Sequence, residues 1–198
     1  MPNFMAFLSY IIITTYTPGP NVIMSMSNAA KYGLKKALPF NLGAAIGVFI
    51  LMLLSSIFSV ALYKFIPSIK PVLTYIGAIY ILYLAWKIFK SKTSYDDKDN
   101  NNNNKTTTSI MSGLLLQFVN PKVIIFCITT VTTFIIPYYN SIITLALFSV
   151  AIALTGFSAT FCWALFGSVF QKLLMKNEKI INTVMALLLV YCAVSLFL

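Results

Sequence analysis

Six long apolar runs dominate this chain of 198 residues and leave little choice of fold. A helix that crosses about 30 Å of hydrocarbon needs about 20 mostly apolar residues, and each run is long enough. Hydrophobic residues make up 59% of the chain and charged residues only 9%, which is outside the range of soluble domains. The sequence therefore predicts an all-α integral membrane protein with six transmembrane helices. The predicted spans are approximately 4–29, 37–65, 70–89, 110–136, 141–170 and 180–198.

A polar segment, SKTSYDDKDNNNNNKTTTS, separates the third run from the fourth. Its asparagine run and mixed charges are typical of a disordered linker with no apolar face to pack. Each side of the linker has three spans, and because three is odd, two repeated halves would be inverted in the membrane, as in many secondary transporters. We therefore predict a three-helix repeat at 1–90, a disordered cytoplasmic linker at 91–109 and a second three-helix repeat at 110–198.

Lysine carries all the positive side-chain charge, because the chain has neither arginine nor histidine. Most lysines lie in the connections after the first, third and fifth runs, and only Lys64 and Lys70 lie on the opposite side. By the positive-inside rule, those three connections are cytoplasmic and both termini lie outside. The net charge of +10 is spread over helix ends and forms no basic face, so we expect no binding to nucleic acid.

The motif TYTPGPN interrupts the first apolar run near its middle. Pro18 and Pro20 each lack an N–H and clash with preceding carbonyl groups, while Gly19 can adopt backbone angles that other residues avoid. The carbonyl groups near Tyr16 and Thr17 should then be left unpaired. Unpaired backbone at membrane depth is tolerated only where it is buried in protein or lines a water-filled cavity, so the break predicts one of these. A simple packing kink is the alternative.

A second interruption lies at comparable depth in the fourth run, GLLLQFVNPKVIIF. Paired interruptions in corresponding spans of two repeats are the best indication in a sequence of a transport site between them. We therefore predict a substrate site between spans one and four, near the middle of the membrane. The candidate substrate-binding residues are Thr17, Pro18, Gly19, Pro20, Asn21, Asn41, Asn120, Pro121 and Lys122.

Lys122 has two interpretations. No carboxylate lies in any span to pair with it, so its ammonium needs water, a ligand or carbonyl oxygens such as those that the breaks release. In the first interpretation, Lys122 attracts the carboxylate of an amino-acid substrate. In the second, the side chain extends to the cytoplasmic interface and only anchors the helix.

The other polar and small residues give weaker evidence about function. Gly43 and Gly47 form a GxxxG motif, which favours close helix packing over ligand contact. Cys127, Cys162 and Cys192 each stand alone in apolar runs without a C-x-x-C pair, so we expect no metal site, no cofactor and no disulfide framework. This disfavours two alternatives, a metal or cation exporter and a membrane thiol-disulfide electron carrier. An enzyme is also disfavoured, because no histidine or buried acid is available as a base.

At these motifs the chain resembles the LysE/RhtB family of amino-acid exporters. PGPN, KYGLKKALPFNLGAAIG, YIGAIYILYLAWKIFKS and GLLLQFVNPKVIIF carry the resemblance, which covers nearly everything outside the linker. It implies a protein of the bacterial cytoplasmic membrane that exports amino acids or close derivatives with the proton gradient, in the lipid bilayer and as a homodimer. It also implies that both interrupted motifs belong to the functional core. Because no span holds an acid, neutral amino acids fit better than cationic ones.

Overall fold

The structure is a computed structural model, and it describes residues 4–58, 72, 75–76, 78–90, 107–170 and 178–195. Every regular element in these ranges is a helix, which confirms the predicted all-α class. The predicted linker lies outside the described residues except for its last three positions, and Lys64 and Lys70 also lie outside them. The division of the chain into two repeats therefore stays a prediction.

The helices follow the predicted runs, with interruptions at both motifs. Two of them, α3 (Leu34–Ile57) and α8 (Ile142–Val169), are long and apolar enough to cross a membrane alone. The helices Ile110–Val119 and Pro121–Ile135 together form a third candidate span, which is bent by 70°. A further apolar helix covers Ala78–Phe89. The labelled elements are α1 (Phe4–Tyr16), α2 (Pro20–Tyr32), α3 (Leu34–Ile57), α6 (Ile110–Val119), α7 (Pro121–Thr129), the π-helix η1 (Thr130–Ile135), α8 (Ile142–Val169) and α10 (Glu178–Ser195).

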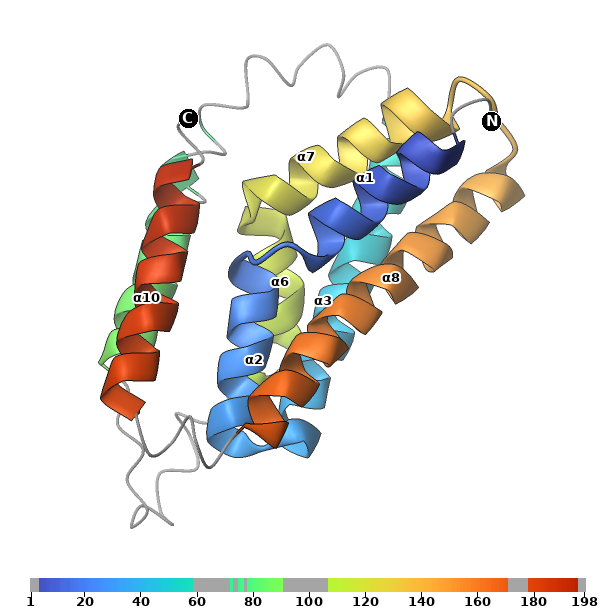
Figure 1. Cartoon of the computed structure of the whole chain (residues 1–198). Coiled ribbons are helices and arrows are strands. Elements are labelled where there is room, and N and C mark those ends of the chain that lie inside the picture. Colours follow the sequence, from blue (N-terminus) through green and yellow to red (C-terminus); the bar gives the residue numbers. More distant parts are fainter. Residues whose placement is uncertain are drawn as a thin grey trace.

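The two long helices form the frame of the molecule (Figure 1). At one end α2 and α6 pack against α3, and α2 also packs against α8. At the other end α1 and α7 lie side by side, with η1 continuing α7. The helix Ala78–Phe89 packs beside α10, and both contribute to one apolar core with Ile23 and Phe40. Both breaks therefore lie near the middle of the frame, where the two ends meet.

Small residues allow the close packing of α3 against α6. A Cβ added at Gly43 would collide with the backbone of Ile110, and one added at Gly47 would collide with the side chain of Gln117. Gly113 on α6 lies equally close to the backbone of α3. The predicted packing role of the GxxxG motif is confirmed, because any side chain at these positions would push the two helices apart.

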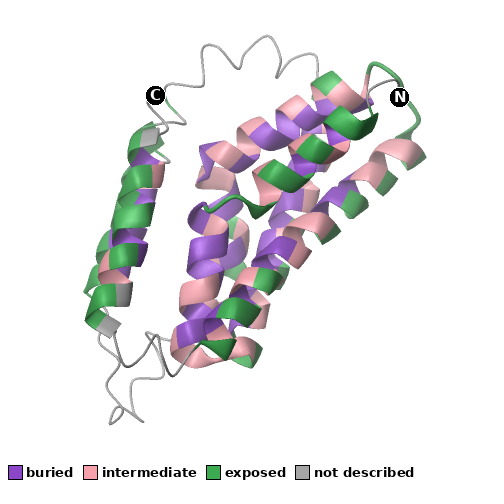
Figure 2. Cartoon of the chain, viewed as in Figure 1, coloured by how far each residue is buried: buried purple, intermediate pink, exposed green. Residues whose placement is uncertain are grey.

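The outer faces of the helices are largely exposed (Figure 2), and many of the exposed side chains are apolar. Large apolar side chains are exposed along the outer faces of α8 and α10, among them Ile142 (85% exposed) and Leu187 (61%). Exposed apolar surface of this extent is typical of helices that face lipid. The interior, in contrast, holds polar side chains: Ser25, Asn28, Asn41, Ser55, Gln117, Asn120, Thr130, Ser149 and Thr160 are buried.

Candidate substrate-binding site

The first break separates α1 from α2 at the predicted motif. The last helical bond of α1 runs from the Thr17 N–H to the Ile13 carbonyl at 3.0 Å, and the helix cannot continue because Pro18 and Pro20 have no N–H. Pro20 then starts α2 as its first residue, where a missing N–H costs nothing. Gly19 has no side chain to cap α2, so the first N–H groups of that helix have no side-chain acceptor.

Side chains from the second half of the protein satisfy the carbonyl groups that this break releases. The indole N–H of Trp163 donates to the Tyr16 carbonyl at 3.3 Å, and the Lys122 ammonium donates to the Thr17 carbonyl at 3.2 Å. The Tyr16 hydroxyl also bonds to the Ser158 hydroxyl at 2.8 Å. The expectation that these carbonyls are unpaired is therefore wrong, because residues distant in the sequence reach them. A simple kink would not need partners on α7 and α8.

The second break is a single residue, Asn120, between α6 and α7. Its side-chain carbonyl accepts the Lys122 N–H at 3.1 Å, so Asn120 caps the helix that begins at Pro121. The backbone carbonyl of Asn120 also accepts the N–H of Val123 at 3.0 Å. This break is a sharp corner that the local sequence completes by itself.

A buried amide cluster joins the two breaks. Asn21 donates to the Gln117 side-chain carbonyl at 2.6 Å, and Gln117 donates back to Asn21 at 3.2 Å. Asn120 donates to the same Asn21 oxygen at 3.4 Å. Gln117 completes its bonding with the Gly113 carbonyl at 2.7 Å. Because Gln117 and Asn120 are almost fully buried, these bonds fix how α2 lies against α6 and α7.

Two cavities flank the bridge between Lys122 and Thr17. The first, here called the α8-side cavity, has a volume of about 60 Å³. A single water needs about 10–15 Å³ on this measure, so the cavity has room for a ligand of a few heavy atoms. It is lined by Thr14, Thr15, Thr17, Gly19, Pro20, Asn21, Val22, Ala44, Val48, Asn120, Lys122, Val123, Phe126, Ile152, Gly156 and Thr160.

The second cavity, here called the α10-side cavity, has a volume of about 470 Å³. It shares Thr17, Gly19 and Lys122 with the first cavity and is closed on its other side by Ile81 and Tyr191. Its walls therefore come from the broken helices, from Ala78–Phe89 and from α10. Lys122 and Thr17, which bond to each other, both line the two cavities.

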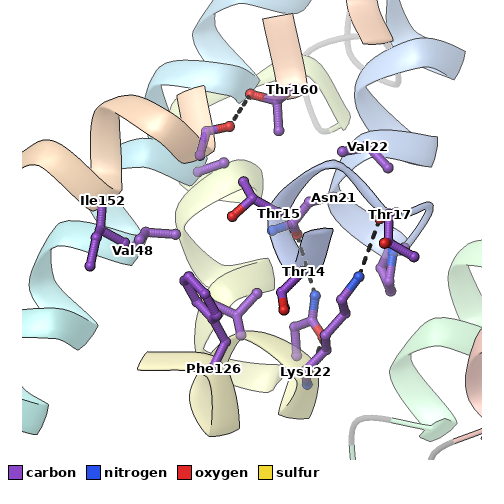
Figure 3. A pocket seen from close by; sticks show the side chains of 16 residues that line it. Thr14, Thr15, Thr17, Asn21, Val22, Val48, Lys122, Phe126, Ile152 and Thr160 are labelled. Atoms are coloured by element: carbon purple, nitrogen blue, oxygen red, sulfur yellow. Dashed lines mark hydrogen bonds between the residues drawn. The ribbon is translucent and has the colours of Figure 1, made fainter. Parts of the chain in front are cut away.

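The α8-side cavity has a polar side and an apolar side (Figure 3). Lys122 and Thr17 lie on one side, and Val48 and Ile152 lie on the other. The Thr15 hydroxyl lines the cavity, is buried and has no hydrogen-bond partner among the described residues. An arrangement with one cation, free donors and an apolar wall suits a small ligand with a charged end and an uncharged side chain.

The predicted site residues come together with two exceptions. Most of them line the α8-side cavity, and Pro18 lines the α10-side cavity. Asn41 and Pro121 line neither of the two. Asn41 is fully buried and accepts a bond from Ser25 at 2.6 Å, which joins α3 to α2, while its amide nitrogen has no hydrogen-bond partner among the described residues. Pro121 is buried at the start of α7, where it shapes the corner.

Sequence reasoning missed several residues of this site. Gln117 stands in an otherwise apolar run, three residues before Asn120, and its isolated polarity was a usable signal. Val48, Phe126 and Gly156 carried no such signal, because apolar residues and glycine are common in any membrane helix. Trp163 was equally hidden among the aromatic residues of α8.

These features together define a class of protein. A strongly apolar outer surface, polar side chains within the core, and two broken helices that meet at a small cavity are the features of a helical membrane transporter. The family model described as LysE type translocator matches residues 12–198. The chain belongs to this family. It is a membrane transporter and not an enzyme.

Curated relatives from two organisms agree in name. The "Cysteine/O-acetylserine efflux protein" of Escherichia coli strain K12 is 38% identical over 192 residues, which cover 97% of this chain and 96% of the relative. The protein of the same name from Shigella flexneri has the same identity and coverage. No solved structure matches the chain.

Proposed function

We propose that this protein is a secondary transporter that exports small neutral amino acids or their derivatives from the cytoplasm. The observation that carries the proposal is the Lys122 ammonium, which bonds to the Thr17 carbonyl at 3.2 Å on the wall of the cavity between the two breaks. Family membership and the names of the relatives, which describe efflux of cysteine and O-acetylserine, support amino acids as the cargo.

The carboxylate of the substrate is bound by Lys122 and by the N terminus of α2. A helix N terminus without a side-chain cap presents N–H donors and a positive dipole end to an anion. Lys122 adds a full positive charge at the same point. The Thr17 carbonyl, released when the ammonium turns to the carboxylate, accepts a bond from the amino group of the substrate.

The side chain of the substrate is then directed to the apolar side of the cavity. Among the described residues, no acidic side chain lines either cavity, so this part of the site offers no partner for a cationic side chain. A small uncharged side chain fits the wall formed by Val48 and Ile152. This argument favours neutral amino acids over lysine or arginine as substrates.

We extend the proposal to the architecture around the site. The chain forms six spans as two inverted repeats, 1–90 and 110–198, joined by a cytoplasmic linker at 91–109. Breaks in spans one and four support this division, because they occupy equivalent positions in the two halves. The start of α1 and the end of α10 point to the same end of the molecule (Figure 1), in agreement with both termini outside. The family resemblance adds a bacterial cytoplasmic membrane, a surrounding bilayer, a homodimer and proton coupling.

Efflux from loaded vesicles tests the proposal. Vesicles that contain the purified protein are loaded with labelled serine, cysteine, lysine or glutamate, and the loss of label is followed. We expect efflux of serine and cysteine, and Lys122→Ala should abolish it because the carboxylate loses its only cation. Lys36→Ala, which removes an exposed lysine of α3 outside the cavities, is the matched control and should leave efflux unchanged.

Each contrary result has a distinct meaning. Undiminished efflux by Lys122→Ala would show that Lys122 anchors the helix and that other residues bind the carboxylate. Efflux of no amino acid by the wild type would contradict the proposed cargo. A variant with all three cysteines replaced by alanine should still export serine, because no disulfide joins Cys127, Cys162 and Cys192; loss of activity there would favour an electron carrier.

A further inference from the structure

Gly156 on α8 differs from the other glycines in the packed helices. A Cβ added at Gly43, Gly113 or Gly167 would collide with the backbone of a neighbouring helix. A Cβ added at Gly156 would meet only the Cγ2 atom of Val48 at 3.9 Å, which is an ordinary van der Waals contact. Helix packing therefore requires glycine at the first three positions and does not require it at Gly156.

The backbone conformation does not require glycine at position 156 either. Gly33, between α2 and α3, is the glycine with a positive φ in the described part of the chain. Gly156 lies inside a regular helix of 28 residues, where alanine is the more stable choice. What glycine adds at this position is empty space, because Gly156 lines the α8-side cavity.

The position of this space gives it a role. In Figure 3, Val48 and Ile152 lie across the cavity from Lys122 and Thr17. Gly156 is one helical turn after Ile152 and in reach of Val48, so it belongs to the same apolar wall. A substrate whose carboxylate is at Lys122 therefore directs its side chain toward Gly156.

We propose that Gly156 is a specificity-determining residue: the absence of a side chain there sets the largest amino-acid side chain that the exporter accepts. The inference rests on the proposed function, because it assumes that the substrate binds in the α8-side cavity. It adds a limit on substrate size and names the residue that imposes it. A methyl group at position 156 reduces the space for the substrate without moving a helix.

A comparison of efflux for two substrates of different size tests the proposal. Vesicles with the wild type, Gly156→Ala or Gly156→Val are loaded with labelled serine and, separately, with labelled O-acetylserine. One methylene group in an apolar pocket changes discrimination by about 10-fold or more. We expect the ratio of O-acetylserine to serine efflux to fall about 10-fold in Gly156→Ala and further in Gly156→Val, because the added side chain hinders the larger substrate more than it hinders serine.

Two matched variants separate substrate size from folding. Ala151→Val adds bulk to an exposed position of the same helix and should leave the ratio unchanged. Gly43→Ala should prevent stable folding, whereas Gly156→Ala should unfold at the same temperature as the wild type or higher. If Gly156→Ala instead fails to fold stably, as is expected of Gly43→Ala, then helix packing requires glycine at position 156 and the inference is overturned.

The remaining outcomes are also decisive. An unchanged ratio in Gly156→Val, or an equal loss of both substrates in Gly156→Ala, would overturn the role of Gly156 while wild-type efflux still supports the proposed function. If the wild type moves neither substrate, the proposed function fails and the size limit fails with it. The wild-type measurement therefore distinguishes the two failures.

Discussion

The two breaks differ in how their backbone groups are satisfied. At the second break, Asn120 caps α7 with its own side chain, through a bond from the Lys122 N–H two residues later. At the first break, no side chain caps α2, and the carbonyls of Tyr16 and Thr17 depend on Trp163 and Lys122. The second break is therefore a local corner, and the first is completed only by the other half of the chain.

This difference indicates which break responds to a ligand. A bond between neighbouring residues is remade wherever the segment moves, but the bond from Lys122 to Thr17 exists only while the two halves hold their present positions. In the proposed function, a substrate carboxylate competes for the same ammonium. Binding would therefore release the first break and leave the second intact, which couples the substrate to the relative position of the halves.

Among the contacts at the two breaks, the largest expected loss of stability comes from the amide that joins them. Gln117→Leu removes both bonds to Asn21 and leaves the partly buried Asn21 amide nitrogen without its acceptor, so the free energy of unfolding in detergent should fall by about 2 kcal/mol. Thr155→Val is the control, because the Thr155 hydroxyl bonds only to its own helix, at the Ala151 carbonyl. Wild-type stability of Gln117→Leu would contradict the role of the cluster.

A smaller effect is expected at the corner of the second break. Asn120→Ala removes the cap of α7 and should lower the free energy of unfolding by about 1 kcal/mol. Ser109→Ala removes the corresponding cap of α6, where Ser109 accepts the Ser112 N–H at 3.1 Å, and should cost a similar amount. Serine efflux should fall only in Asn120→Ala, because only Asn120 lines the cavities. Equal serine efflux by both variants would show that Asn120 caps α7 and does not contribute to transport.

The smallest effect is expected from the partner of the Tyr16 carbonyl. Trp163→Phe keeps the aromatic ring but removes the indole N–H, and a single bond between membrane helices stabilises by about 0.6 kcal/mol. Unfolding in detergent should show a loss of this size. Trp86→Phe, at a side chain that is 62% exposed, is the control and should show none. An equal loss in both would mean that the bond to Tyr16 contributes nothing.

Much of the fold could be predicted from the sequence because its signals are local. Proline and glycine act on their own backbone, so Pro18, Pro20 and Pro121 located both breaks before any contact was known. Apolar runs predicted helices and a lipid environment for the same reason. The π-helix that continues α7 could not be predicted from the apolar run, because no residue of Thr130–Ile135 is typical of a π-helix.

The site itself was only partly predictable. The residues of both motifs were expected to meet, and most of them line one cavity. Asn41 looked equally suitable, but it bonds to Ser25 and lines neither cavity. A polar residue in an apolar run must find a partner, and the sequence does not say whether that partner is a ligand or another helix.

By itself, then, the sequence determined the class of protein, the two breaks and the presence of Lys122 beside the second break, because each of these follows from the chemistry of a residue and its neighbours. Only the tertiary structure decided that Lys122 reaches Thr17, that Trp163 reaches Tyr16, and that Gly156 opens onto a cavity. These contacts join residues far apart in the chain. They depend on how closely whole helices approach, and small residues such as Gly43 set that distance only when a partner helix is present.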